Sequence, residues 1–462
     1  MKEKLTALKF EYVYALLMLI FGIALVFINP PFQIPDSGAH FSRSYQISEG
    51  YFRSPLQKKN TDKDFCFYSD IPESIIELIK NEKTSMNPKE VPSWKHYHSF
   101  DFTRKMFSIP LNEEENLKYT SRIRNTGAYS PLVYAPQALF IFLARETFDT
   151  VGAVYYSSKI GALLFTIVCI FLAMKLLPEK KLLIFVLAFA PTFLLEISTY
   201  SADSVTYSIA ILATAYLLHL RKSATPISTK EIFCIALIAV ALGLLKYVYG
   251  TILLLYFLIP AERFENKRKF FLYGVFFIVI FFVTVLGWIV FAKAGQTVEL
   301  AASPKADMYA QLAFITSEPL QFIKIFFHTL EVYSLEYYRQ LVGVIGWIID
   351  ILPDAFFIFY GFVLLFAAAV GNINLTIKQR LFMVAAVFPT VFAMLFYTYI
   401  LWTPVKYEVI TSIQGRYFIP CALMLFASLS FIKNFKYETL FAFIFGNICA
   451  GVTIWQVLDY FY

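Results

Sequence analysis

The segment "YVYALLMLIFGIALVFI" (Tyr12 to Ile28) is an unbroken apolar run that leads directly into "NPPFQIPDSGAHFSRSYQISEG" (Asn29 to Gly50). A membrane-spanning helix needs about 20 apolar residues, within a range of roughly 17 to 25, so the first segment is long enough to cross a bilayer. Asn-Pro-Pro follows it in place of a small-residue cleavage site, which predicts a retained first helix. The chain then presents an aspartate, a histidine and an arginine directly after that helix.

The composition of the whole chain is that of a membrane protein. The 462 residues are 58% hydrophobic and 16% charged, with a mean hydropathy of +0.61, which excludes an ordinary water-soluble protein. The net charge is +7, but the basic residues gather in short connectors between apolar runs, so the positive-inside rule explains them without a nucleic-acid partner. Four of the five cysteines lie in apolar runs and no CxxC motif occurs, so no disulfide framework is predicted.

The length rule predicts an all-α fold, a polytopic bundle of transmembrane helices with about 11 spans. The basic connectors belong on the cytoplasmic side together with the lysine-rich start of the chain. The segment 129–148 is also long enough to cross, which would give about 12 spans, but crossing would place the later basic connectors outside. A short interfacial or re-entrant helix is therefore preferred there. The predicted spans are 12–28, 157–177, 182–198, 203–220, 231–247, 248–261, 270–292, 355–371, 381–401, 416–432 and 438–458.

Two polar segments are predicted to form external loops. The first is large and has nearly equal numbers of acidic and basic residues, and the second is rich in Tyr and Phe with near-helical spacing, which predicts interfacial helices. The predicted organisation is a first transmembrane helix (1–29), external loop 1 with the candidate catalytic segment (30–128), a transmembrane module (129–292), an external loop with interfacial helices (293–353) and C-terminal transmembrane helices (354–462).

The first candidate site is the segment after the first helix. Asp36, His40 and Arg43 are spaced by four and three residues, so they share one face of a helix. A carboxylate there could accept a proton from a substrate hydroxyl while the cations hold an anion nearby. The alternative is structural, with Asp36 capping an interfacial helix and Arg43 pairing with a lipid phosphate.

Two further candidates are ionisable residues within apolar surroundings. Asp203 and its neighbour Glu196 occur in "EISTYSADSVTYS", and Lys246 stands alone in "LGLLKYVYGTILLL". Such residues cost roughly 2.5–3.5 kcal/mol at the centre of a spanning helix on insertion scales, so they usually face a cavity or a partner. The alternatives are a polar hairpin tip for the two acids and snorkelling of the ammonium to the headgroup level for Lys246.

The last candidate is "TSIQGRYFIPCALMLF", in which Gln414 and Arg416 precede a predicted span. The free N–H groups at a helix start and the donors of an Arg fork together suit a phosphate; an interfacial anchor is the alternative. His96 and His98 in "WKHYH" have no carboxylate cluster nearby, so no metal site is predicted from them.

Six motifs follow one another along the chain: Pro-Pro-x-x-x-x-Asp-x-x-x-His, "GAYSPLVYAPQAL", "YSADS", the lone lysine, "LVGVIGWIIDILP" and "QGRYFIP". Their order resembles a bacterial multi-pass membrane family catalogued without an assigned function, which looks like a branch of the GT-C superfamily of integral-membrane glycosyltransferases. The resemblance covers most of the chain. GT-C enzymes use polyprenyl-linked sugars and carry an essential acid in the first external loop.

The resemblance implies roles for individual residues. Asp36 matches the essential acid, and Lys246 and Arg416 match positions that contact the lipid-linked phosphate. Asp203 matches an acid with a supporting role. Where many GT-C proteins have a second acid beside the first, this chain has Ser37, which leaves a requirement for a divalent cation open. No bound organic cofactor is expected.

The implied function is transfer of a sugar, with inversion, from a polyprenyl-phosphate donor to a glycan or lipid-linked glycan acceptor of the cell envelope. Asp36 would be the base, with His40, Arg43, Asp203, Lys246, Gln414 and Arg416 as substrate-binding residues. The implied location is the bacterial cytoplasmic (inner) membrane, with the active site on the external face and contacts to membrane lipids. The competing interpretations are a transporter or flippase of a lipid-linked glycan and a non-catalytic envelope-assembly protein.

Overall fold

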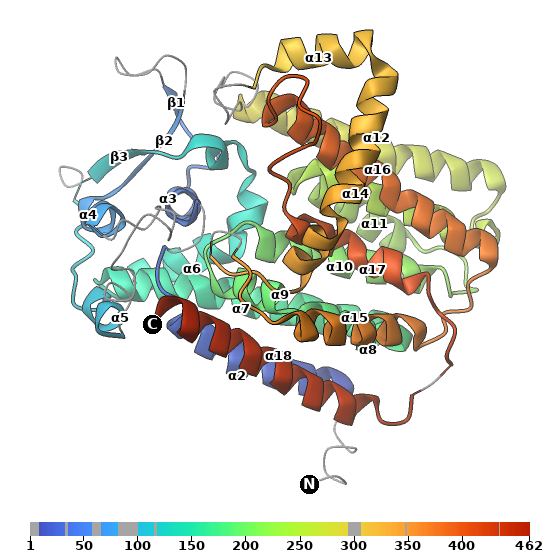
Figure 1. Ribbon diagram of the computed structural model, residues 1–462, viewed down its shortest axis with the longest axis horizontal. Coiled ribbons are helices and arrows are strands. Elements are labelled where there is room, and N and C mark those ends of the chain that lie inside the picture. Colours follow the sequence, from blue (N-terminus) through green and yellow to red (C-terminus); the bar gives the residue numbers. More distant parts are fainter. Residues whose placement is uncertain are drawn as a thin grey trace.

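The computed structural model describes residues 9–32, 36–57, 66–81, 100–114, 118–293, 306–346, 349–433 and 435–462. It is a bundle of helices that carries a smaller layer of helices and strands at one end (Figure 1). We call this end the polar end; its helices are α3 (Ser37–Ser48), α4 (Glu73–Asn81) and α5 (Phe100–Met106). The predicted all-α membrane architecture is confirmed, and a small sheet is added to it.

Among the described residues, five helices are long and apolar enough to cross a membrane. They are α2 (Phe10–Ile28), α7 (Val151–Leu176), α12 (Lys267–Ala292), α16 (Ile377–Leu401) and α18 (Glu438–Phe461). The helices α8 (Lys181–Ala188) and α9 (Pro191–Ser198) form a sixth candidate that is bent by 73°. The bend falls where Pro191 begins α9, because proline has no N–H for the helical ladder and its ring crowds the preceding turn.

The remaining predicted spans also fall on helical segments, but these have 18 residues or fewer. They are α10 (Asp203–Leu220), α11 (Thr229–Leu244), η7 (Tyr247–Leu258), α15 (Asp354–Ala369) and η11 (Gly415–Phe418) followed by α17 (Ile419–Ala427). Two further short helices, η6 (Pro178–Lys180) and η8 (Ala261–Arg263), connect longer ones. The prediction of about 11 to 12 spans therefore exceeds the five or six described helices that qualify by length and composition. A hydropathy window does not detect helix breaks such as those at Pro191 and Lys246.

The segment 129–148 contains the short helices η5 (Pro131–Tyr134) and α6 (Ala135–Arg145). The 11 residues of α6 rise about 16 Å at 1.5 Å each, which is about half of a hydrocarbon core roughly 30 Å thick. The helix packs against α7 and α3. The structure thus contains the short helix that positive-inside reasoning preferred over a twelfth span.

The second predicted external loop contains the two helices α13 (Met308–Ser317) and α14 (Pro319–Val342). Asp307 caps α13 by accepting hydrogen bonds from two backbone amides, and Pro319 begins α14, where a missing N–H costs nothing. Figure 1 shows α14 running across the direction of α16, and Leu320 and Leu335 on it are 73% and 65% exposed. The predicted helices are confirmed, and their position at the membrane interface stays a prediction.

The sheet at the polar end packs against α3. Its strands β1 (Leu56–Gln57), β2 (Cys66–Pro72) and β3 (Lys118–Arg122) are antiparallel in the order β1-β2-β3. Leu56 lies opposite Phe67, and Tyr68 lies opposite Arg122. The Gln46 side chain of α3 donates to the Tyr68 carbonyl at 3.0 Å. The short helix η4 (Arg124–Ala128) then returns the chain to the bundle.

Buried polar contacts fix the point at which the chain leaves the bundle. Lys159 of α7 donates to the carbonyl oxygens of Val26 and Asn29, at 2.6 and 3.4 Å, and so satisfies carbonyls at the end of α2. The Asn29 side chain donates to the Ser198 hydroxyl at 2.9 Å, which ties α2 to α9. The start of the Asp36 segment is therefore held by two neighbouring helices.

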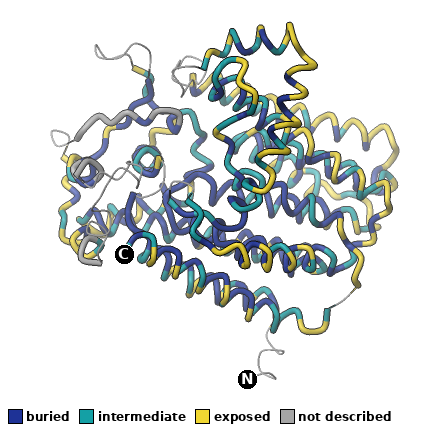
Figure 2. The backbone as a smooth tube through the Cα atoms, in the orientation of Figure 1, coloured by how far each residue is buried: buried dark blue, intermediate teal, exposed yellow. Residues whose placement is uncertain are grey.

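Exposed residues concentrate on the outer helices of the bundle, whereas α8, α9 and α10 are almost wholly buried (Figure 2). The outward face of α12 is apolar; Val283 and Val290 on it are 63% and 76% exposed. An exposed apolar face on a helix of this length is typical of contact with lipid.

Candidate functional site

Asp36 precedes the first residue of α3, yet it does not cap the helix with its side chain. Its backbone is in the left-handed region, with φ 60° and ψ 7°, and its side chain makes no capping hydrogen bond. Asp and Asn are the non-glycine residues that tolerate this conformation best. The carboxylate is exposed, and no hydrogen bond or ion pair joins it to another described residue. The capping interpretation is therefore wrong for the side chain, and the carboxylate is free to contact a ligand.

His40 lies one helical turn further along α3, among aromatic and charged side chains. Its Nδ1 is 2.6 Å from the Tyr134 hydroxyl, and its ring stacks on Tyr129 with the ring centroids 6.2 Å apart. Burial, reinforced by the cations Lys246 and Arg416, lowers the pKa of His40 to about 3. His40 is therefore neutral near pH 7, which corrects the expectation that it serves as a cation for an anionic substrate.

The depressed pKa of His40 predicts a pH-dependent stability. An unfolded histidine titrates near 6.5, whereas folded His40 titrates at about 3, so between these values the unfolded state binds the extra proton. Stability from neutral His40 is complete above about pH 6.5 and decreases as the pH falls toward 3. We expect the midpoint of thermal unfolding in detergent to fall less between pH 7 and pH 4 for His40→Gln than for the wild type. Parallel curves for both proteins would contradict this.

Arg43 is occupied by the protein's own groups. It is fully buried, and it donates to the carbonyl oxygens of Tyr51 and Phe52 at 3.0 and 2.6 Å and to Gln46 Oε1 at 2.7 Å. A further contact reaches the Tyr129 carbonyl at 3.4 Å. The burial lowers its pKa to about 10. The structure thus gives Arg43 a role in fixing two loops around α3, and it does not place the guanidinium beside Asp36 as a free anion ligand.

Asp203, Lys246 and Arg416 come together although they are far apart in the sequence. Lys246, between α11 and η7, places its Nζ 2.5 Å from Oδ1 of Asp203 at the start of α10. Arg416 of η11 places its Nε 3.8 Å from Asp203 Oδ2. The Lys246 ammonium also lies over the Tyr417 ring, 4.5 Å from its centroid. The structure thus brings together three residues that the sequence indicated only as separate candidates for substrate binding.

Glu196 completes the cluster. This residue of α9 forms an ion pair with Arg416 Nη1 and is only 5% exposed. Two carboxylates therefore face two cations, an arrangement that avoids an uncompensated buried charge. The helix α3 packs against η5, where His40 contacts Tyr134, and η5 in turn packs against α10 and α11, the helices next to Asp203 and Lys246. The segment after α2 and the buried cluster thus border one another.

A close backbone contact fixes the position of Arg416. A Cβ atom on Gly415 would lie 1.9 Å from the Tyr337 carbonyl oxygen of α14, so no larger residue fits at this position. The Gly415 amide donates to Gln340 Oε1 at 2.6 Å. The Tyr249 hydroxyl of η7 donates to the Tyr417 carbonyl at 3.0 Å. The η11 turn is therefore clamped between α14 and η7, with Arg416 directed toward both carboxylates.

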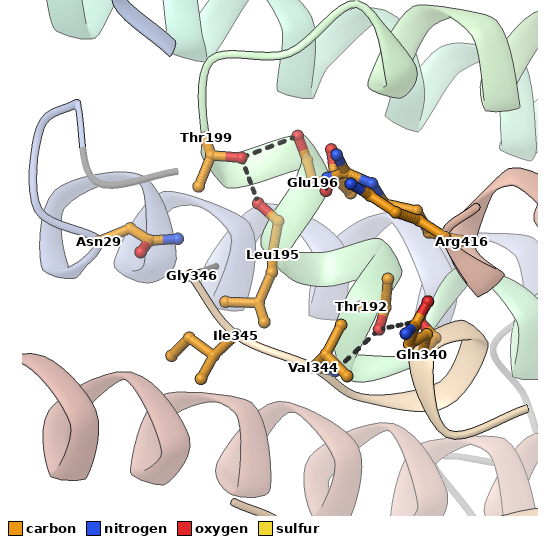
Figure 3. A pocket seen from close by; sticks show the side chains of 11 residues that line it. Asn29, Thr192, Leu195, Glu196, Thr199, Gln340, Val344, Ile345, Gly346 and Arg416 are labelled. Carbon is orange, nitrogen blue, oxygen red and sulfur yellow. Dashed lines mark hydrogen bonds and ion pairs between the residues drawn. The ribbon is translucent and has the colours of Figure 1, made fainter. Parts of the chain in front are cut away.

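A partly open pocket adjoins this cluster on the side of Glu196 and Arg416 (Figure 3). It lies between the end of α2, α9, the end of α14 and the η11 turn. Gln414, predicted as a substrate-binding residue, lies in its wall. The lining residues are Asn29, Thr192, Leu195, Glu196, Thr199, Gln340, Val344, Ile345, Gly346, Gln414 and Arg416.

Sequence reasoning noted Glu196 but did not include it among the site residues, and it missed Gln340 and the loop 343–346. An acid in an apolar run was the available signal for Glu196. The described residues contain no group of three or more His, Cys, Asp or Glu side chains arranged to hold a metal ion. His96 and His98 lie outside the residues that the structure describes.

A family model described as "Predicted membrane protein (DUF2142)" matches residues 19–425, which is most of the chain and includes every candidate residue named above. No curated protein and no solved structure matches at a significant level. Together with the apolar helices, the match identifies a multi-pass membrane protein, and the chain belongs to the DUF2142 family of predicted membrane proteins.

Proposed function

We propose that the protein is a GT-C-type glycosyltransferase that moves a sugar from a polyprenyl-phosphate donor to a glycan acceptor of the cell envelope. One observation carries the proposal: an exposed carboxylate, Asp36, begins α3, and α3 is joined through η5 to the helices next to a buried cluster that contains Lys246 and Arg416. A base that is open to water and cations that lie deeper in the bundle are what a transferase needs to join a water-soluble acceptor to a lipid-linked donor.

Asp36 is the base in this mechanism. Its carboxylate takes the proton of an acceptor hydroxyl as the hydroxyl oxygen bonds to the anomeric carbon. The bond from that carbon to the phosphate oxygen breaks on the opposite face, so the configuration inverts and the polyprenyl phosphate leaves with the bonding electron pair. Positioned base catalysis of this kind contributes typically about 10²–10⁴-fold.

Lys246 and Arg416 are the groups that stabilise the departing phosphate. Both are paired with carboxylates, but their side chains remain 23% and 17% exposed, so a ligand can reach them. Arg416 Nε has no hydrogen-bond partner among the described residues and keeps a donor for a phosphate oxygen. Fixed cations in a site with little water stabilise developing negative charge more than they do in solution.

The membrane context supports a lipid-linked donor. The polyprenyl tail would lie along the apolar helices, and the polar end would cover the acceptor on the external face of the bacterial inner membrane. Asp36, His40, Tyr129 and Tyr134 would then line the acceptor side of the site. The positive-inside distribution of the connectors is the support for this orientation.

The proposal is tested by mass analysis of envelope glycans from cells that lack the protein and from cells that regain it. We expect one sugar residue to be missing without the protein and restored with it. Accumulation of a complete lipid-linked glycan on the cytoplasmic side would instead identify a flippase. Unchanged glycan composition with altered envelope assembly would identify a non-catalytic role.

A further inference from the structure

The pocket beside Arg416 contains two buried acceptor atoms without a donor in the described part of the protein. They are Glu196 Oε2 and Gln414 Oε1. The other carboxylate oxygen of Glu196 accepts from Arg416. The Ser201 hydroxyl accepts from the Asp203 amide at 2.9 Å and lies close enough to Glu196 to interact with its charge, but its geometry to Oε2 is not that of a hydrogen bond. Because a buried acceptor without a partner is destabilising, both atoms favour a ligand that donates hydrogen bonds.

The other polar groups of the pocket wall are largely satisfied within the protein. The Thr192 hydroxyl donates to the Gln340 carbonyl at 2.9 Å and accepts from the Val344 amide at 3.1 Å. Gln340 Oε1 accepts from the Gly415 amide. Among the described lining residues, the buried side-chain atoms without a hydrogen-bond partner are therefore the two acceptors and one donor, Arg416 Nε, which already lies 3.8 Å from Asp203 Oδ2.

The unsatisfied acceptors determine which kind of ligand can bind in the pocket. A phosphate or carboxylate offers acceptor atoms and would leave Glu196 Oε2 and Gln414 Oε1 unsatisfied. A cation would face the Arg416 guanidinium in the same wall. A neutral group with several hydroxyls fits both constraints, since each hydroxyl donates one hydrogen bond and carries no charge.

The pocket also has an apolar wall. The side chains of Leu195, Val344 and Ile345 line it, and Figure 3 shows them together with the Glu196–Arg416 pair around the same space. A sugar ring has hydroxyls at its edge and C–H groups on its faces, so it can use both kinds of surface at once. Few other neutral groups combine the two.

We infer that this pocket is the subsite for the sugar ring of the lipid-linked donor, with Glu196 Oε2 and Gln414 Oε1 accepting hydrogen bonds from two of its hydroxyls. The inference rests on the proposed function. Arg416 borders both the pocket and the Asp203–Lys246 pair, so a phosphate at Arg416 would place its attached sugar within one glycosidic bond of the pocket.

The test is a set of binding measurements on the full chain in lipid nanodiscs. The probes are undecaprenyl phosphate and the same lipid carrying glucose, galactose, mannose or N-acetylglucosamine. We expect the wild type to bind one glycosylated lipid more tightly than the bare phosphate. Glu196→Gln and Gln414→Leu should each lower the preference for that lipid over the bare phosphate about tenfold, which is the effect of one hydrogen bond to a charged or buried acceptor.

Glu231→Gln is the matched control, because Glu231 also pairs with a buried arginine, Arg263, but does not line the pocket. Gln414→Leu keeps the test valid if Glu196→Gln fails to fold, since it leaves the ion pair intact. Equal losses for bare and glycosylated lipids, or no loss for either, would overturn the sugar subsite. A wild-type protein that binds the bare phosphate but no glycosylated lipid more tightly would also overturn it, whereas one that binds none of the probes would remove the proposed function.

Discussion

Asp36→Asn is expected to abolish sugar transfer while leaving the folded protein intact, with a loss of about 10²–10⁴-fold in rate. Asparagine has nearly the same shape as aspartate and tolerates the left-handed backbone at this position, where φ is 60°. The carboxylate makes no hydrogen bond or ion pair with a described residue, so its removal should cost little stability. What disappears is a group that can accept a proton.

The measurement is a complementation assay that compares envelope glycans from cells carrying the wild type or Asp36→Asn at matched membrane levels. Asp149→Asn serves as the control, because it makes the same chemical change at an exposed position just before α7. If Asp36→Asn restored the glycan fully, Asp36 would not be the base, and a transport or assembly role would be favoured. Loss with both variants would show that the assay does not report on Asp36 alone.

The sequence predicted the helices of the bundle well, because a bilayer imposes a length and a hydropathy that can be read from one chain. It predicted the number of spans less well, because breaks such as the one at Pro191 divide apolar runs without changing their composition. The small sheet at the polar end was not predicted. Its strand β2 is mixed in character and buried at all but one of its seven residues, so it lacks the alternation that marks a half-buried strand.

The candidate site could be predicted only as a set of isolated charges. Asp203 and Lys246 were found because ionisable residues are costly in apolar surroundings and usually have a partner, and Arg416 was found because a helix start and an arginine together suit a phosphate. Their mutual pairing depends on contacts between residues separated by up to 220 positions, such as Glu196 and Arg416, and no local pattern encodes these. Arg43 shows the opposite case, since its spacing to Asp36 suggested a ligand but its partners are loop carbonyls.

Arg416→Ala is expected to lower the stability of the folded protein strongly. The substitution leaves two almost fully buried carboxylates, Glu196 and Asp203, to share the single cation Lys246. Removing one partner of a buried ion pair typically costs about 3–5 kcal/mol, because the remaining charge is uncompensated. The measurement is the midpoint of thermal unfolding in detergent, and an unchanged midpoint would contradict the ion-pair network.

The double variant Arg416→Ala with Glu196→Gln separates stability from ligand binding. It removes one positive and one negative charge, so the Asp203–Lys246 pair stays neutral and most of the lost stability should return. Binding of undecaprenyl phosphate should not return, because the guanidinium that would hold the phosphate is still absent. If the double variant bound this lipid as tightly as the wild type, Arg416 would be a structural residue only, and Lys246 alone would remain as the cation for the departing phosphate.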